Sequence, residues 1–351
     1  MDIKLETIPG RVAILNGKAY RYFSGTSYLG MAQYEPFKAA VAEGVARYGV
    51  NFGGSRLGNI RFSIFEEAEA WLATFTGAGA ALTASSGSVA GQLLVRYLKD
   101  KGSLYSAPGL HPALWAEGHH FNGPFEAWAD LIVQECSRKR GPMVLLSNAV
   151  DPLFARPYPF EWLDRIPPDA TVTLVLDDSH GLGVCGENGA GAFSVVKPPP
   201  QVEMVVVSSL GKALGVPGGV ILGRPGLIQA LWHSPFFGGA SPIAPAFLYG
   251  MLQVKEHYPQ ALGRLRASIR RFREPVLATG LFRSFMDYPV FYTPEHRLGP
   301  WLETHGCLLS QFAYPTPEDE PVTRIVLNAL HEAEDIDYLV AVIRRFLESL
   351  S

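Results

Sequence analysis

The sequence is poor in cysteine, and its cysteines follow no pattern. Cys136, Cys185 and Cys307 are odd in number and lie far apart, so they suggest neither a disulfide framework nor a metal site. Thiols that stay reduced are typical of the cytoplasm, where disulfides rarely persist. We therefore expect a cytoplasmic protein that holds no metal.

An excess of positive charge and a long apolar run are also missing. The 30 Lys and Arg residues are outnumbered by 33 Asp and Glu, for a net charge of -3, which argues against a nucleic-acid partner. Asp2, Lys4 and Glu6 stand where a signal peptide would need a basic start followed by apolar residues. No charge-free apolar stretch is long enough to cross a bilayer. We expect no export and no membrane span.

The sequence does contain short apolar runs that alternate with helical patterns, which predicts an α/β fold with a mostly parallel sheet. Its 351 residues, 48% of them hydrophobic, suffice for a sizeable core. Strands buried on both faces are expected at residues 143–147, 172–176, 204–207 and 219–222. Helices are expected at residues 65–75, 88–98, 244–257 and 335–347. The carboxyl ends of the strands should carry the chemistry.

The residue composition and the predicted elements change after about Pro259. The proline-rich run 197–201 is interpreted as a surface connection and not as a boundary, because predicted strands flank it. A basic helical stretch at 264–273 is followed by short aromatic strands and a closing helix. This change indicates a separate carboxyl-terminal small domain.

One lysine stands among small residues directly after a predicted strand. Lys212 lies in the segment 208–215 (SSLGKALG), where a planar ligand could approach the backbone closely. Such a lysine is a candidate for a Schiff base with a cofactor. The alternative for an isolated Gly-Lys pair is a solvated loop lysine.

A carboxylate suited to the same cofactor ends an earlier strand. Asp177 and Asp178 follow the predicted strand 172–176. The pyridinium nitrogen of pyridoxal 5'-phosphate (PLP) needs a carboxylate that keeps it protonated, so that the ring can withdraw electrons. Asp177 is interpreted as that carboxylate, and His180 as a hydrogen-bond partner of the phenolic oxygen. A turn or a helix cap is the alternative for the two aspartates.

Two segments raise the question of phosphate binding. Residues 85–88 (SSGS) precede an apolar helical stretch, so their backbone amides could hold a phosphate monoester, with a simple helix cap as the alternative. Ser209, just before the candidate lysine, favours the phosphate. Residues 181–186 match the dinucleotide fingerprint G-x-G-x-x-G. We reject that match, because residues 177–180 separate it from the strand and no acidic residue follows at the required spacing.

Together these segments resemble the α-oxoamine synthase family, the fold-type I PLP enzymes that condense an amino acid with an acyl-CoA thioester. The resemblance covers nearly the whole chain and rests on residues 27–30 (SYLG), 53–56 (GGSR), 177–180 (DDSH), 186–189 (GENG) and 211–213 (GKA). It implies a homodimer. It also implies a large PLP-binding domain at 46–258 with a mostly parallel seven-stranded sheet, and a small α+β domain formed by 259–351 and the segment 1–45.

The resemblance assigns roles residue by residue. Lys212 resembles the imine lysine, Asp177 the pyridinium partner and His180 the neighbour of the phenolic oxygen. His111 resembles the histidine that stacks on the cofactor, with a loop or capping histidine as the alternative and His119 and His120 as weaker candidates. The remaining positions are Gly87, Ser88 and Ser209 for the cofactor phosphate, Ser241 for the neighbouring subunit's phosphate, and Arg324 and Ser27 for the amino-acid carboxylate.

The chain departs from the family where substrates are concerned. Thr26 and Ser27 replace an Asn-Asp or Asn-Asn pair, Phe65 stands where a histidine is common, and residues 147–152 (SNAVDP) replace a Thr-Glu-Gly stretch. We expect an acyltransferase that condenses an α-amino acid with an acyl-CoA or other acyl thioester, with decarboxylation, to an amino ketone. The alternatives are another fold-type I activity, such as an aminotransferase, and a non-catalytic PLP-binding descendant.

Overall fold

The computed structural model describes residues 4–138, 141–314 and 318–350. The chain divides into two compact units, of which the smaller contains Met1–Glu35, Asp151–Arg156 and Glu256–Ser351, and the larger contains Pro36–Val150 and Pro157–Lys255. The boundaries expected from the sequence lie after residues 45 and 258, and they do not assign residues 151–156 to the small domain. Each unit is described by itself.

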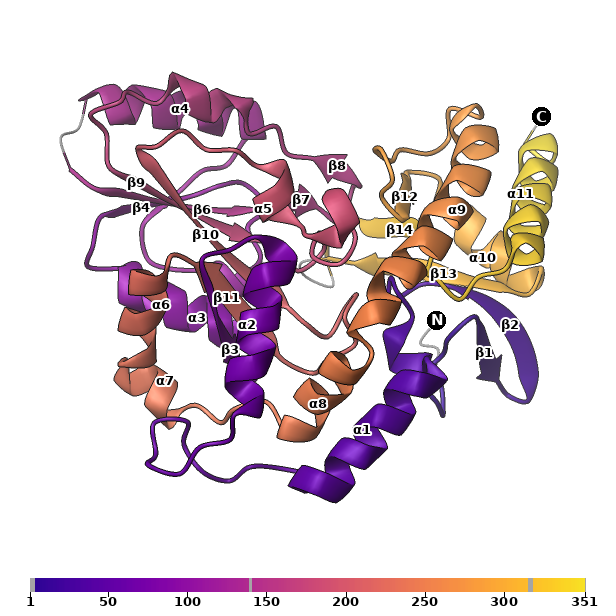
Figure 1. The fold of residues 1–351 in the computed structure, drawn as a ribbon. Coiled ribbons are helices and arrows are strands. Elements are labelled where there is room, and N and C mark those ends of the chain that lie inside the picture. The colour runs from indigo at the N-terminus through magenta and orange to yellow at the C-terminus, as the bar shows by residue number, and fades with distance from the viewer. Residues whose placement is uncertain (1–3, 139–140, 315–317, 351) are drawn as a thin grey trace. The chain divides into compact units, whose positions relative to one another are not determined.

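The larger unit is built on a seven-stranded sheet (Figure 1). Its spatial order is β3 (Ala80–Ala84), β11 (Gly219–Gly223), β10 (Val202–Ser209), β9 (Val172–Asp177), β6 (Met143–Asn148), β4 (Ser103–Ser106) and β5 (His119–His120). The pairs from β10 to β5 are parallel, whereas β11 runs antiparallel to both of its neighbours. The predicted α/β class and the mostly parallel sheet are confirmed.

The central strands form because their side chains are apolar on both faces. β6 is buried at every position, and β9 at every position but one. Helix α3 packs against β10 and β11 and contributes Leu93 and Leu94 to one core with Val205 and Ile221. Strands of this kind need helices on both sides of the sheet, as predicted from their continuous apolar runs.

The larger unit contains several helices. They are α1 (Glu35–Tyr48), α2 (Ile64–Thr76), α3 (Gly87–Leu98), α4 (Phe125–Arg138), α5 (Ala192–Val195), α6 (Pro225–Trp232), α7 (Pro235–Gly239) and α8 (Pro245–Gln253). Of these, α2, α3 and α6 pack on the sheet. Figure 1 shows α2 near the β3 end of the sheet and α4 near its β4 end, where Tyr105 of β4 donates to Glu135 of α4 at 2.9 Å. The expected helix 244–257 was too long, because the α-helix ends before Val254 and a short 3-10 turn, η5 (Lys255–His257), follows.

Short 3-10 turns and one small ribbon complete the connections. The turns are η1 (Met31–Gln33), η2 (Pro112–Leu114), η3 (Glu161–Arg165) and η4 (Glu187–Gly189), and the ribbon pairs β7 (Val150–Asp151) with β8 (Arg156–Pro157). The proline-rich run 197–201 connects α5 to β10 outside any helix or strand, as expected.

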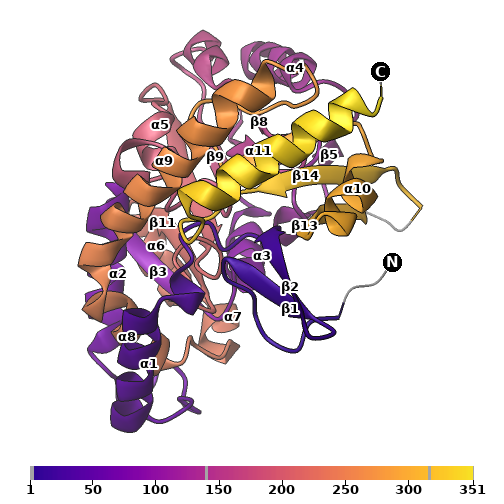
Figure 2. The same ribbon diagram turned by 90° about the vertical axis from the view of Figure 1, so that its right-hand side faces the viewer.

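The smaller unit contains a five-stranded sheet. Its order is β1 (Val12–Leu15), β2 (Lys18–Phe23), β13 (Cys307–Ala313), β14 (Pro321–Val326) and β12 (Val290–Thr293), with only β2 and β13 parallel. Figure 2 shows α11 (Ala333–Glu348) beside α9 (Tyr258–Leu277), and α10 (Leu298–Thr304) packs on β13. Asn16 and Gly17 close the β1–β2 hairpin with positive φ angles of 52° and 74°.

A buried carboxylate fastens this hairpin to α11. The side chain of Asp335 is 1% exposed and accepts hydrogen bonds from Arg11 at 2.5 Å and from Arg21 at 3.1 Å. Asp335 also forms a capping box with Glu332 at the start of α11. Charged side chains therefore join segments that are more than 300 residues apart in the sequence.

A buried histidine in the smaller unit predicts sensitivity to acid. His331 accepts the Asn328 N–H at Nδ1 (3.0 Å), lies 2.9 Å from the Tyr22 carbonyl at Nε2 and stacks on Phe23. Burial lowers the pKa of His331 to about 4. Because the pKa of an unfolded histidine is near 6.5, the stabilisation that depends on neutral His331 is complete above pH 6.5. It is lost as the pH falls toward 4, which lowers the free energy of unfolding by about 3 kcal/mol.

We therefore expect the free energy of unfolding to fall between pH 7 and pH 4 more steeply in the wild type than in His331→Gln. Urea unfolding followed by circular dichroism at each pH measures this free energy for the two proteins. Parallel pH profiles for the two proteins would contradict this assignment.

In the described part of the chain, no helix is both long enough and apolar enough to span a membrane.

Candidate active site

Three strands of the larger unit end in polar residues at one edge of its sheet. β6 ends at Asn148, β9 at Asp177 and β10 at Ser209, and antiparallel β11 begins beside them, since Gly219 pairs with Ser209. Parallel strands bring their carboxyl ends to the same edge, which is where open α/β sheets bind ligands. The topology therefore assembles residues that lie far apart in the sequence.

Lys212 and His180 meet at this edge. Lys212 lies in the loop between β10 and β11, which is closed by hydrogen bonds from Leu210 N–H to the Gly218 carbonyl and from Val216 N–H to the Leu210 carbonyl. Its Nζ lies 2.7 Å from Nε2 of His180. The amine and the imidazole can therefore share a proton, and both side chains are only half-buried.

Asp177 is held at the end of β9 by its neighbours. Its side chain is 7% exposed, and Oδ1 accepts the Ser179 N–H at 2.9 Å. The Ser179 hydroxyl in turn accepts the Ser209 N–H at 2.8 Å. Ser179 thus connects the carboxylate at the end of β9 with the end of β10, a role that the sequence reasoning missed.

The neighbouring Asp178 has a different environment. It is 2% exposed, and its Oδ2 accepts the Ala192 N–H at 2.7 Å. A side chain at Gly181 or Gly191 would collide with this carboxyl, so these glycines are needed where they stand. Burial raises the pKa of Asp178 to about 7, and the charge of Asp177 adds to the rise. Asp178 therefore organises the turns after β9, whereas Asp177 faces the site.

His111 lies beside Asp177. Its Nδ1 is 3.5 Å from Oδ2 of Asp177 and accepts the Ala113 N–H at 3.2 Å, which begins the short turn η2. Desolvation lowers the pKa of His111, Asp177 raises it and Lys212 lowers it, for a net decrease. His111 therefore caps the turn η2 and also lies beside Asp177. The weaker candidates His119 and His120 lie on the exposed strand β5, where His119 stacks on Tyr105.

The serine-rich segment also reaches this edge. A Cβ on Gly87 would lie 3.1 Å from the Cα of Ser209, so the start of α3 packs closely against the end of β10. Ser86 caps α3 by accepting the Val89 N–H at 3.1 Å, and Ser88 is exposed in its first turn. The amino terminus of α3 can thus hold an anion. Ser241 is exposed in the loop between α7 and α8.

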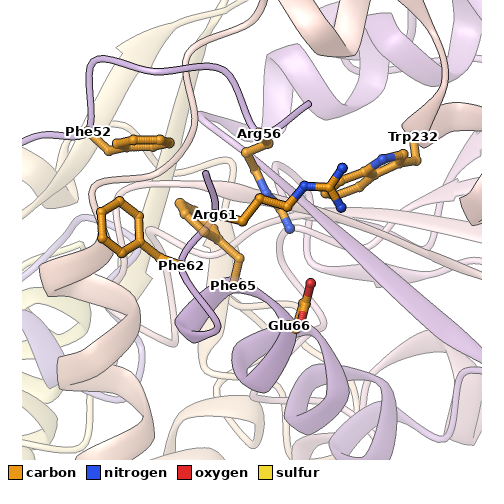
Figure 3. Close-up of a pocket in the computed structure, with 7 residues that line it drawn as sticks. All are labelled: Phe52, Arg56, Arg61, Phe62, Phe65, Glu66 and Trp232. Carbon is orange, nitrogen blue, oxygen red and sulfur yellow. The ribbon is translucent and has the colours of Figure 1, made fainter. Parts of the chain in front are cut away.

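The GGSR segment has a structural role in the larger unit. The guanidinium of Arg56 is buried, binds Glu69 and Thr83 at 3.0 and 3.1 Å, and lies 4.4 Å from the centre of the Phe65 ring. Phe65, at the position where a histidine is common, therefore supports an arginine through a cation–π contact. Figure 3 shows the pocket beside them, lined by Phe52, Arg56, Arg61, Phe62, Phe65, Glu66 and Trp232.

The smaller unit holds the two proposed substrate residues. Arg324 in β14 is 6% exposed, and its Nη1 donates to the Pro152 carbonyl at 2.6 Å. Its buried Nε has no hydrogen-bond partner among the described residues. Ser27 is half-buried in the connection between β2 and η1, where its carbonyl accepts the Gly30 N–H at 2.9 Å. The Arg324 guanidinium retains a donor that a carboxylate could use.

Comparison with known sequences identifies the family. The profile of aminotransferase class I and II matches residues 157–343. The 8-amino-7-oxononanoate synthase of Serratia proteamaculans is 32% identical over 358 residues, covering 95% of this chain and 91% of the relative. That of Citrobacter koseri is 30% identical, covering 95% and 91%. The chain belongs to the α-oxoamine synthase family.

Solved structures show the same fold for the α-oxoamine synthase chain. Serine palmitoyltransferase of Sphingomonas wittichii matches with a TM-score of 0.83 at 18% identity, covering 97% of this chain and 90% of the other. The 8-amino-7-oxononanoate synthase of Francisella tularensis matches with a TM-score of 0.73 at 21% identity, covering 94% and 98%. The predicted fold-type I architecture is therefore confirmed.

As an α-oxoamine synthase relative, the chain is a PLP-dependent transferase, and its residues fit this cofactor. A lysine is available for covalent attachment, and a buried carboxylate suits a pyridinium nitrogen. The close approach of Gly87 to Ser209 at the start of α3 leaves a cradle that a side chain would crowd and that a phosphate suits. Lys212, Asp177, His180 and His111 would surround the ring, and Gly87, Ser88 and Ser209 would hold the phosphate.

Proposed function

We propose that this enzyme joins an α-amino acid to an acyl thioester. The amino acid loses its carboxylate as carbon dioxide, its α-carbon forms a bond to the acyl carbon, and the thiol leaves with one proton taken from solution. The product is an α-amino ketone. An acyl-CoA is the proposed donor, with other acyl thioesters as the alternative.

The observation that supports this reaction most directly is the similarity to two synthases over about nine-tenths of their length. Their names describe a product with an amino group on C8 and an oxo group on the adjacent C7, which is an α-amino ketone. The site at the sheet edge fits the same chemistry, because it combines an amine base with a carboxylate and a histidine pair.

Each residue has a proposed task. When bound, PLP supplies a ring that withdraws electrons from the substrate α-carbon. Lys212 removes and returns the α-proton. His180, whose Nε2 lies 2.7 Å from the Lys212 amine, hydrogen-bonds the phenolic oxygen of the cofactor. Asp177 keeps a proton on the ring nitrogen of the cofactor. His111 covers the ring beside Asp177 and excludes water from it.

Substrate binding and assembly complete the proposal. Arg324 binds the amino-acid carboxylate, a task suited to a guanidinium with an unused donor, and Ser27 contributes a further contact. The enzyme acts as a homodimer in which Ser241 contacts the phosphate held by the neighbouring subunit. The exposure of Ser241 leaves it available for that contact.

We expect free thiol to appear when the enzyme is given a small amino acid together with a CoA thioester. Condensation consumes one amino acid per thiol, so a thiol reagent and an amino-acid assay should report equal rates. Carbon dioxide should be released at the same rate. Omission of either substrate should stop thiol release, which controls for simple thioester hydrolysis.

A transaminase would behave differently in the same experiment. It would release a keto acid from the amino acid without any thioester and would need a second keto acid to continue. That half-reaction, at a rate matching turnover and without thiol release for any acyl chain tested, would overturn the condensation. It would leave the cofactor site as described.

A further inference from the structure

Asn148, at the end of the neighbouring strand β6, contacts the segment that contains His111. The segment between β4 and η2 has no regular structure, and the His111 side chain is 43% exposed. Asn148 contacts the backbone of this segment twice. Its Oδ1 accepts the His111 N–H at 3.1 Å, and its Nδ2 donates to the Gly109 carbonyl at 2.8 Å.

We propose that Asn148 is a positioning residue, which holds His111 beside Asp177 by clamping the backbone on both sides of Leu110. Asn148 is 7% exposed and stands opposite Asp177 in the β6–β9 register. One rigid amide plane thus sets the distance between the imidazole and the carboxylate. Both of its side-chain hydrogen bonds go to the backbone of the His111 segment, so Asn148 acts through His111.

The contacts require an amide at this position. An amide offers one donor and one acceptor, and both are used here, whereas a carboxylate offers only acceptors. A carboxylate would set an oxygen against the Gly109 carbonyl and would add a negative charge next to Asp177. The need for both a donor and an acceptor explains why an asparagine stands in residues 147–152, where the family has a Thr-Glu-Gly stretch.

The inference rests on the PLP site and not on the identity of the acyl donor. It therefore has readouts that do not depend on condensation. The pKa of His111 is one, because desolvation and Lys212 lower it while Asp177 raises it. The affinity for PLP is the other, because His111 is proposed to cover the cofactor ring.

The test compares Asn148→Ala with Ser147→Ala in the full-length protein. Ser147 is the matched control, since it is fully buried on the same strand and its hydroxyl donates to the Asn148 carbonyl at 2.9 Å. Histidine titration by NMR should show the His111 pKa rising toward its ordinary value in Asn148→Ala, because the ring becomes more hydrated. Ser147→Ala should leave it unchanged.

PLP binding and turnover should change in a defined way. We expect Asn148→Ala to weaken PLP binding and lower kcat by about tenfold each, with the amino-acid KM changed less than about twofold. Asn148→Asp should keep the His111 contact but repel Gly109, and its added charge should raise the His111 pKa further. This second variant also serves if Asn148→Ala fails to fold.

A double-mutant cycle separates positioning from general destabilisation. If Asn148 acts through His111, then Asn148→Ala should change PLP affinity by less than about twofold in a His111→Ala background. An undiminished tenfold effect in that background would overturn the proposal. An unchanged His111 pKa in folded Asn148→Ala, or an equal shift in Ser147→Ala, would overturn it as well.

Discussion

Replacement of Lys212 by alanine is expected to abolish the covalent attachment of PLP and to lower turnover by about 10³-fold or more. The lysine amine is proposed both to hold the cofactor and to move the α-proton, and its Nζ lies 2.7 Å from Nε2 of His180. The loop that carries Lys212 is fixed by its own backbone hydrogen bonds, so the fold should survive the change.

The attachment site can be measured directly. Borohydride reduction of the wild type followed by peptide mass mapping should place the reduced PLP adduct on Lys212. The exposed Lys197, whose Nζ donates to the Phe193 carbonyl at 2.9 Å, provides a control, and Lys197→Ala should keep both the adduct and the activity. An adduct on a different lysine would show that the assignment is wrong.

Replacement of Asp177 by asparagine is expected to lower kcat by about 10²- to 10⁴-fold while PLP remains attached. An amide cannot stabilise a protonated ring nitrogen as a carboxylate does. The amide oxygen can still accept the Ser179 N–H, so the end of β9 should keep its structure. Visible absorbance of bound PLP should persist, and steady-state kinetics should report the loss.

Asp178→Asn provides the matched control for this change. Asp178 is buried away from the site, and the amide oxygen of asparagine can still accept the Ala192 N–H. Because burial raises the pKa of Asp178 to about 7, a neutral side chain costs little there near neutral pH. We expect kcat to fall less than about tenfold. If Asp178→Asn were the more severe variant, the wrong carboxylate would have been assigned to the ring.

The sequence predicted the central strands well, because strands buried on both faces consist of continuous apolar runs. β6, β9, β10 and β11 were all anticipated, each with ends within two residues of those observed. β3, β4 and β5 were not, since short strands at the sides of a sheet form through pairing with neighbours. The β1–β2 hairpin was also missed, although Asn16-Gly17 between two short runs was a usable signal.

The sequence by itself determined the cofactor chemistry, because Lys212 lies among small residues and Asp177 ends a buried strand, and these are local properties. Only the tertiary structure decided which groups meet. The 3.5 Å approach of His111 to Asp177, the Asn148 clamp and the burial of Asp178 depend on strands that lie far apart in the sequence. Parallel pairing brings their carboxyl ends to one edge, and pairing across a sheet is a nonlocal interaction that no short segment encodes.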